Sequence, residues 1–162
     1  MTLDKDDNVY ISSSYHYTVY RFAPDGTQKT AFAAAADLNP FGLAFDRNGL
    51  LYVADQDFNT VRRFSATGVD LGSFATTGLN YPFALAFDDL GDLYVSNQLG
   101  GGIRRFSSTG ADLGYFAVVT TIPANPVGLA FMPVPEPSIG VLVMLAAASA
   151  RRRRRIITSD LG

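Results

Sequence analysis

The sequence of 162 residues predicts an all-β fold, a partial β-propeller of three four-stranded blades, followed by a C-terminal hydrophobic helix. Three observations lead to this prediction. The chain repeats itself with a period of 42 residues, each period contains four short runs of β-forming residues, and polar turn formers separate these runs. Four strands in about 40 residues is the size of one propeller blade.

The repeat is clearest in the middle of the chain. Residues 40–46 (Pro-Phe-Gly-Leu-Ala-Phe-Asp) return without a gap as residues 82–88 (Pro-Phe-Ala-Leu-Ala-Phe-Asp). We therefore expect propeller blades at about 1–38, 39–80 and 81–124. Further segments keep the same spacing: 51–55 with 93–97, 61–64 with 103–106, 70–74 with 112–116, and, in a third copy near the N-terminus, 9–11 and 19–22.

The apolar positions within the predicted strands are continuous rather than alternating. Leu43-Ala44-Phe45 and Leu51-Tyr52-Val53 are two such runs. Continuous apolar runs are typical of strands that are buried on both faces. Blades of a propeller stack on both faces, so this pattern agrees with the predicted architecture. Turn formers separate the strands of the second period at residues 46–49, 56–59, 67–68 and 77–78.

The two ends of the repeat region complement each other. The first period lacks nearly all of its opening strand, and residues 125–132, which include 126–131 (Pro-Val-Gly-Leu-Ala-Phe), supply one opening strand after the third period. Three blades are fewer than the four to eight of a typical ring. Two interpretations stay open: two chains form one six-bladed ring as a homodimer, or the chain is the C-terminal piece of a longer protein. The second is favoured because residues 1–30 contain no basic region followed by an apolar run.

The repeat resembles the NHL type. The shared pattern is Pro-x-Gly-hydrophobic at 40–43, Gly-x-Leu-Tyr-Val-Ala-Asp at 49–55, a strand with Arg-Phe at 61–64, and a closing glycine. The resemblance implies a six-bladed propeller as the complete domain. A Trp-Asp signature is missing from the sequence, which disfavours the WD class of propeller.

The segment 133–155 contains three parts in a fixed order, and residues 156–162 form a tail. An apolar helix followed by arginines enters a membrane with the arginines on the cytoplasmic side, so the preceding residues lie on the far side. The apolar run is shorter than the about 20 residues that span a bilayer, so it crosses a thinned bilayer or engages a protein partner. The parts are Val134, Pro135, Glu136, Pro137 and Ser138; the apolar run from Ile139 to Ala150; and Arg151, Arg152, Arg153, Arg154 and Arg155.

This order closely resembles the PEP-CTERM sorting signal of bacterial surface proteins. The Pro-Glu-Pro box of that signal is recognised by a membrane-embedded processing enzyme of the exosortase type. The resemblance implies an exported protein that is anchored in the membrane of the cell envelope or surface through its C-terminus, or released after processing. It also implies that the protein lies in an extracellular matrix and that its ligand is a polysaccharide or another protein.

Charge and composition exclude several classes of function. Residues 1–150 carry 8 basic and 14 acidic side chains, so this part is a poor ligand for nucleic acid phosphates. Cysteine is absent, which excludes disulfides, thiol nucleophiles and thiolate metal sites.

The sequence does not predict an enzyme, a cofactor or a metal site, and we identify no catalytic residue. Glu136 is the single glutamate and belongs to the sorting box, and His16 is the single histidine. The period places Phe58 and Gly100 at the position of His16, so we expect a surface histidine. The fold is also similar to that of gluconolactonase-type lactonases and of lyases that act on cyclic peptides, such as streptogramin lyase. An alternative function is therefore the C-terminal fragment of a propeller hydrolase or lyase.

Two sets of polar residues recur with the period. Asp55 and Asn97 end the second strand of two blades, with Ser13 at the same place in the first. They could line one mouth of the propeller and bind a cation or a sugar, or cap the adjacent turn as Asx residues do. The other set is Arg21, Arg63 and Arg105, for which we expect a structural role between blades rather than a ligand site, with pairing to Asp70 or Asp112 as one form of that role.

The sequence thus predicts an exported surface or matrix protein. Its propeller repeats would act as a binding or scaffolding module, sorted through the C-terminal signal.

Overall fold

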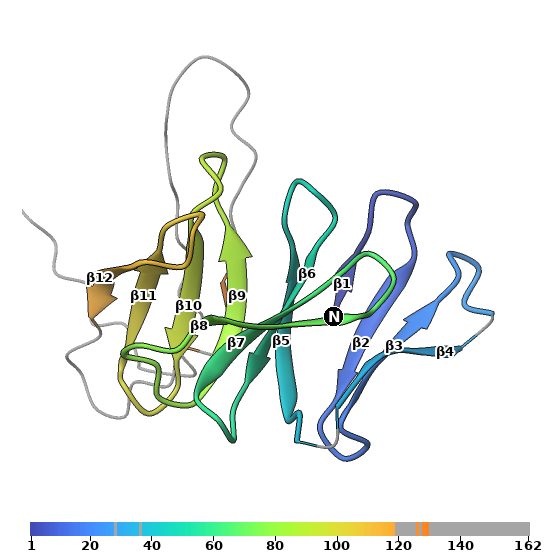
Figure 1. Cartoon of the computed structure of the whole chain (residues 1–162), viewed down its shortest axis with the longest axis horizontal. Helices are drawn as coiled ribbons and strands as arrows, with labels where there is room; N and C mark the ends of the chain where they lie inside the picture. The colour runs from blue at the N-terminus through green and yellow to red at the C-terminus, as the bar shows by residue number, and fades with distance from the viewer. Residues whose placement is uncertain (28, 36, 119–125, 127, 130–162) are drawn as a thin grey trace, which may run out of the picture.

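The computed structural model describes residues 1–27, 29–35, 37–118, 126 and 128–129. Within these ranges the chain forms twelve strands and no helix. The strands, labelled in Figure 1, are β1 (Thr2–Leu3), β2 (Val9–Ser13), β3 (Thr18–Phe22), β4 (Thr30–Ala34), β5 (Pro40–Phe45), β6 (Leu51–Asp55), β7 (Thr60–Phe64), β8 (Asp70–Ala75), β9 (Pro82–Phe87), β10 (Leu93–Asn97), β11 (Gly102–Phe106) and β12 (Asp112–Val118).

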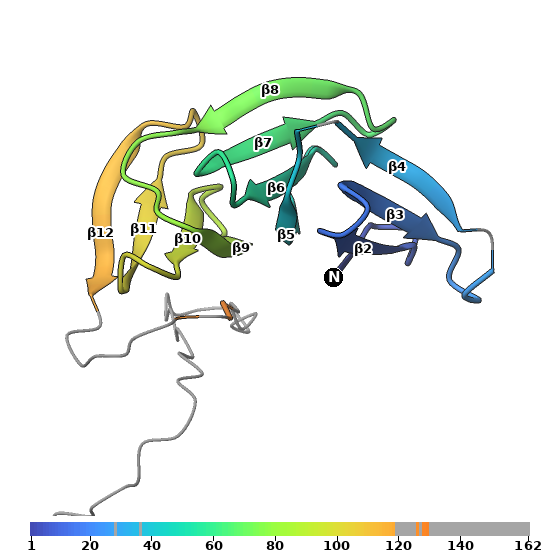
Figure 2. The ribbon, with the colours of Figure 1, turned by 90° about the horizontal axis from the view of Figure 1, so that it is seen from below.

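The strands form three antiparallel sheets of four consecutive strands each. We call β1–β4 blade 1, β5–β8 blade 2 and β9–β12 blade 3. Figure 2 shows the sheets as a fan, with β5 and β9 on its inner side and β4, β8 and β12 on its outer side. This arrangement confirms the prediction of a partial propeller with three four-stranded blades. β1 has only 2 residues, in agreement with an incomplete opening strand.

Several predicted elements lie outside the described residues. These are the sorting box, the C-terminal hydrophobic helix and its arginines, and all of the predicted closing strand except Pro126, Gly128 and Leu129. In the part of the chain that the structure describes, no helix is long and apolar enough to cross a membrane.

The core of the molecule lies between the blades rather than within any one of them. All five residues of β6 and all five of β10 are buried, which confirms that the central strands are covered on both faces. One apolar cluster joins blades 1 and 2, and a second joins blades 2 and 3. In the first cluster Tyr10 and Val19 of blade 1 pack with Leu51, Val53 and Phe64 of blade 2.

An aspartate organises the turn between the first and second strands, which we call the first turn, in every blade. In blade 2 one oxygen of Asp46 accepts hydrogen bonds from the backbone nitrogens of Asn48 and Leu50, each at 2.9 Å. The other oxygen accepts a hydrogen bond from the hydroxyl of Tyr52 at 3.4 Å. Because the tyrosine is buried, its hydroxyl needs such a partner. The same contacts recur for Asp4 with Tyr10 and for Asp88 with Tyr94.

The buried tyrosine also ties successive blades together. The ring of Tyr10 makes edge-to-face contacts with Phe32 of its own blade and with Phe45 of the next, both at 4.8 Å between centroids. Such pairs stabilise a fold by about 0.5–1.5 kcal/mol beyond the burial of their area. Tyr52 makes the equivalent contacts, with Phe74 and Phe87.

A glycine in the turn between the third and fourth strands, which we call the third turn, lies against the preceding blade. Gly68 has a φ of +82° and Gly110 a φ of +86°, a backbone conformation that favours glycine. A Cβ atom on Gly68 would overlap the carbonyl oxygen of Phe32, and a Cβ atom on Gly110 would overlap that of Phe74. Glycine is therefore required at each of these positions for two reasons. The turn needs a positive φ, and the preceding blade leaves no room for a side chain.

We expect Gly110→Ala to lower the free energy of unfolding by about 2–4 kcal/mol, because it combines a strained φ with an overlap between blades. The matched control is Gly49→Ala, where φ is +77° and no atom lies within 4 Å of an added Cβ. That change should cost only about 1–2 kcal/mol for the backbone strain. Urea denaturation measures both values, and equal costs would show that blade packing does not require glycine there.

Candidate functional site

The two residues predicted to line a mouth of the propeller, Asp55 and Asn97, are wholly buried, with 0% of their surface exposed. One carboxylate oxygen of Asp55 accepts a hydrogen bond from the backbone nitrogen of Asn39 at 3.2 Å. The side-chain oxygen of Asn97 accepts one from the backbone nitrogen of Asn80 at 3.1 Å. Each side chain thus holds the loop that leads into the first strand of its own blade, as Asx residues often do. A ligand at this mouth stays a prediction.

Asp55 and Asn97 differ in their second side-chain atom. The Nδ2 of Asn97 donates a hydrogen bond to the carbonyl oxygen of Gly78 at 2.9 Å, whereas the Oδ2 of Asp55 has no hydrogen-bond partner. Nη1 of Arg62 lies 3.9 Å from that oxygen. Burial raises the pKa of the Asp55 carboxyl, and the hydrogen bond from Asn39 and the charge of Arg62 offset only part of this effect.

The arginine pairing expected from the sequence is wrong. Arg21, Arg63 and Arg105 recur with the period, but none of them binds Asp70 or Asp112. Successive side chains of a strand point to opposite faces, and the preceding arginine of the Arg-Arg pair shares a face with the aspartate of the fourth strand. Arg62 pairs with Asp70 and also with Asp37, at 2.9 Å, while Arg104 pairs with Asp112 and Arg105 with Asp92.

His16 lies in the exposed turn between β2 and β3. Its Nδ1 atom is 2.9 Å from the Oγ atom of Ser13, and its ring is in edge-to-face arrangement with Tyr15 and Tyr20, at 5.1 and 6.0 Å between centroids. A catalytic triad also needs a third group that orients the imidazole. Among the described residues, no carboxylate is hydrogen-bonded to this ring. The contact with Ser13 therefore closes a local turn.

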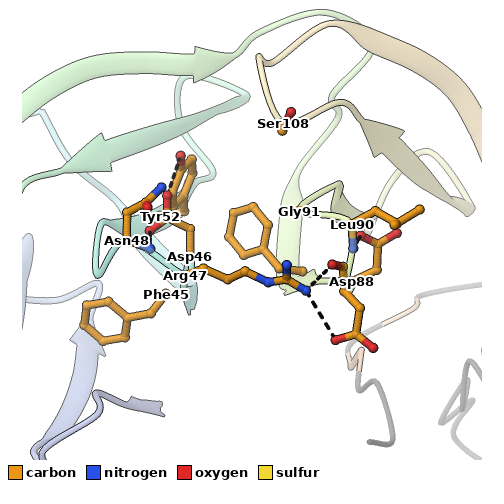
Figure 3. Close-up of a pocket in the computed structure, with 11 residues that line it drawn as sticks. Phe45, Asp46, Arg47, Asn48, Tyr52, Asp88, Leu90, Gly91 and Ser108 are labelled. Carbon is orange, nitrogen blue, oxygen red and sulfur yellow. Dashed lines mark hydrogen bonds and ion pairs between the residues drawn. The ribbon is translucent and has the colours of Figure 1, made fainter. Parts of the chain in front are cut away.

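A pocket of about 490 Å³ opens between blades 2 and 3, at the other end of β6 from Asp55. The first turns of both blades and the third turn of blade 3 form its walls. Figure 3 shows Arg47 reaching from the turn of blade 2 to the turn of blade 3. The residues that matter for its chemistry are the aromatic Phe45, Tyr52 and Phe87 and the polar Arg47, Asp89 and Ser108.

The polar groups of the pocket divide into two kinds. Asp46 and Asp88 are held by backbone hydrogen bonds of their own turns, so their role is structural. Arg47 and Asp89 are well exposed, with 67% and 102% of their side-chain surface accessible. Nη2 of Arg47 donates a hydrogen bond to the carbonyl oxygen of Asp89 and lies 3.7 Å from its carboxylate. Breaking the contact between these two exposed side chains costs little stability, so both can bind a ligand instead of each other.

This pocket is not predicted by the sequence. The run Asp46-Arg47-Asn48-Gly49 predicts a turn, and nothing in that run predicts that Arg47 crosses to the next blade. A signal for the crossing does exist in the repeat. Lys5, Arg47 and Asp89 occupy equivalent positions of the three periods, so a cation in blade 2 meets an acid at the same place in blade 3.

Within the described part of the chain, no three acidic, histidine or cysteine side chains are grouped so that they could hold a metal ion. The residues of the sorting box, the apolar run and the arginine block lie outside that part. Their roles remain predictions.

No protein-family model matches the sequence, and no curated protein matches it significantly. Solved structures do match. A structural-genomics target assigned as a gluconolactonase has a TM-score of 0.67 and 27% identity, over 81% of this chain and 50% of that one. Virginiamycin B lyase from Staphylococcus aureus has a TM-score of 0.65 and 18% identity, over 79% and 43%. A chain in a complex of nidogen and laminin has a TM-score of 0.66 and 22% identity, over 79% and 49%.

This chain therefore spans about half the length of the structures that it matches. The likenesses to the lyase and to the nidogen–laminin chain, both under 25% identity, show the shared propeller fold and nothing finer. The same architecture occurs in two proteins named as enzymes and in a protein–protein complex, so the fold alone does not select a function.

We expect Asp55→Asn to raise the free energy of unfolding at neutral pH by about 1 kcal/mol, because it removes a buried carboxylate of which one oxygen accepts no hydrogen bond. The carboxyl has a raised pKa in the folded state, so its contribution to stability is present below the unfolded pKa and is lost as pH rises through the folded pKa. The gain should therefore shrink as the pH falls into the acid range. Urea denaturation of both proteins over a pH series measures the difference.

The reciprocal control is Asn97→Asp in blade 3. A carboxylate there cannot donate to the carbonyl oxygen of Gly78, so stability at neutral pH should fall by about 1–3 kcal/mol. A loss of stability in Asp55→Asn would mean that the attraction between Asp55 and Arg62 outweighs burial.

Proposed function

We propose that this chain is a binding or scaffolding module of an exported surface protein, and that the pocket between blades 2 and 3 takes a polysaccharide. The observation that carries this proposal is the composition of the pocket. The partly exposed rings of Phe45 and Phe87 lie beside an exposed guanidinium at Arg47 and an exposed carboxylate at Asp89. Ligand pockets generally combine apolar walls with a few polar groups that orient the ligand.

A neutral sugar chain suits these groups. Its hydroxyls can accept hydrogen bonds from Arg47 and donate them to Asp89, while its C–H faces pack on the exposed parts of the Phe45 and Phe87 rings. An anionic polymer suits them less well, because residues 1–150 carry 14 acidic and only 8 basic side chains. Neutral polysaccharide is therefore the ligand class we propose, and a protein ligand would be a different outcome of the test.

We expect Arg47→Ala to weaken binding of the best neutral glycan from a glycan array about tenfold, since hydrogen bonds to charged groups contribute about 1.5–3 kcal/mol. Isothermal titration calorimetry gives the affinity. The matched control is Lys5→Ala, which removes the equivalent cation of blade 1, 88% exposed and ion-paired with its neighbour Asp6. Its affinity should equal that of the unchanged protein. Failure of every glycan to bind, or equal losses in both variants, would refute the assignment of this pocket.

We further propose that residues 133–155 direct the chain to the cell surface. The order of Pro135-Glu136-Pro137, an apolar run and five arginines supports this proposal. The propeller would then lie on the far side of the membrane, where a surface or matrix polysaccharide is within reach.

A fusion that carries residues 133–162 behind a secretion signal should reach the membrane of a host that has an exosortase-type enzyme, and should be processed near Pro135-Glu136-Pro137. Glu136→Gln should block processing while the protein stays in the membrane, because the apolar run and the arginines are unchanged. Immunoblots of membrane and medium fractions distinguish the two forms. Equal processing of both fusions would contradict a sorting role for the box.

A second candidate function is a fragment of a propeller hydrolase or lyase. The likeness to the structure assigned as a gluconolactonase, at 27% identity, favours it. The catalytic residues would then belong to blades beyond the three described here. A longer product of the same gene, in which further blades supply glutamate and histidine ligands and which cleaves a lactone or a cyclic peptide, would support this second candidate against the first.

A further inference from the structure

Blade 1 has an apolar face that the other two blades bury. In blades 2 and 3 the face turned toward the preceding blade includes Leu51, Val53 and Phe64, or their equivalents in blade 3, and all of these are 0% exposed. The equivalent residues of blade 1 are Val9, Ile11 and Phe22. Ile11 is 39% exposed and the other two are half-buried. Leu3, at the position of Phe45, is 52% exposed.

The third turn of blade 1 repeats the same contrast. Gly26 is equivalent to Gly68 and Gly110 and has nearly the same backbone, with a φ of +78°. The other two glycines lie on the carbonyl oxygens of Phe32 and Phe74, whereas no atom lies within 4 Å of a Cβ placed on Gly26. Blade 1 thus has the turn that packs on a preceding blade in blades 2 and 3, but no described residue packs on it there.

The surface on which such a turn packs is present on β12, the outer strand of blade 3. Phe116 occupies the position of Phe32 and Phe74, on which the third turns of blades 2 and 3 lie. It is 42% exposed, and Val118 beside it is 57% exposed. Ala117, between these two residues, is also more exposed than its equivalents. It is half-buried, whereas Ala33 and Ala75 are 0% and 2% exposed.

We propose that these two faces bind each other in separate copies of the chain, so that blade 1 of one copy docks on β12 of the second. Gly26 would lie on the backbone of Phe116, and Leu3, Ile11 and Phe22 would gain the cover that their equivalents have in blades 2 and 3. The repeat indicates a second copy as the partner, because Gly68 on Phe32 and Gly110 on Phe74 join the same two surfaces, one repeat of 42 residues apart. This inference goes beyond the proposed function and does not depend on it.

Two copies should close into one ring. The chain covers 50% of the gluconolactonase-type structure and 49% of the nidogen–laminin chain, so each copy supplies half of a propeller of that size. After two head-to-tail contacts the second copy meets the first again, and the assembly ends as a symmetric dimer. Heterologous contacts that failed to close would instead give open chains.

The test compares the full chain with Gly26→Asn by sedimentation in mild detergent. Asparagine tolerates the left-handed backbone, and the open space around Gly26 leaves room for its side chain in a single copy. In the dimer that side chain would overlap the backbone of Phe116, so we expect dimer formation to weaken about 30-fold or more. The melting temperature of the isolated copy should stay nearly unchanged.

The matched control is Gly49→Asn, with a φ of +77° and equally open surroundings but no place in a blade interface. It should dimerise like the unchanged protein. If Gly26→Asn itself unfolds, Val118→Asp tests the opposite face of the same contact. A monomeric unchanged chain, open assemblies larger than a dimer, or a dimer that survives the substitutions at Gly26 and Val118 would each overturn the proposal.

Discussion

The packing of one blade against the next is the constraint on which the rest of this structure depends. Every residue of β6 and β10 is buried. Exposure of either face of these strands to water would therefore cost much of the free energy gained from apolar burial. A single four-stranded sheet of this sequence cannot bury both of its faces by itself. Stability therefore comes from neighbouring units, as in other repeat proteins.

The same packing explains the pocket. The first turns are held rigidly by Asp46 and Asp88, and the stacking of blades 2 and 3 brings these turns side by side. Arg47 then faces Asp89 across the gap. The chemistry of the pocket thus depends on which residue each period places after its turn aspartate, while the architecture needs only the aspartate itself. Binding residues can therefore vary from blade to blade without loss of the fold.

Most of the fold could be predicted from the sequence because it depends on local, repeated signals. Continuous apolar runs such as Leu51-Tyr52-Val53, separated by turn formers, predicted both the strands and their burial on two faces, and the structure confirms both. The short opening strand of blade 1 was also predicted, since Leu3 and Asp4 align with the end of a full strand in the second period.

The features that the sequence did not predict depend on side-chain direction and on contacts between blades. The recurrence of Arg63 and Arg105 drew attention to them, but strand alternation assigns the ion pairs with Asp70 and Asp112 to Arg62 and Arg104. The crossing of Arg47 to the next blade could be recognised only after the two turns were placed next to each other. A repeat shows which residues are equivalent, and only three-dimensional packing shows which of them meet.

The most direct test of this account is a nuclear Overhauser measurement between the third turn of one blade and the outer strand of the preceding blade. Stacked blades should give cross-peaks from the Hα protons of Gly110 to the ring of Phe74, and from those of Gly68 to the ring of Phe32. Cross-peaks from these glycines to residues of their own blades alone would contradict it, because the blades would then not be stacked in the way that places the pocket between them.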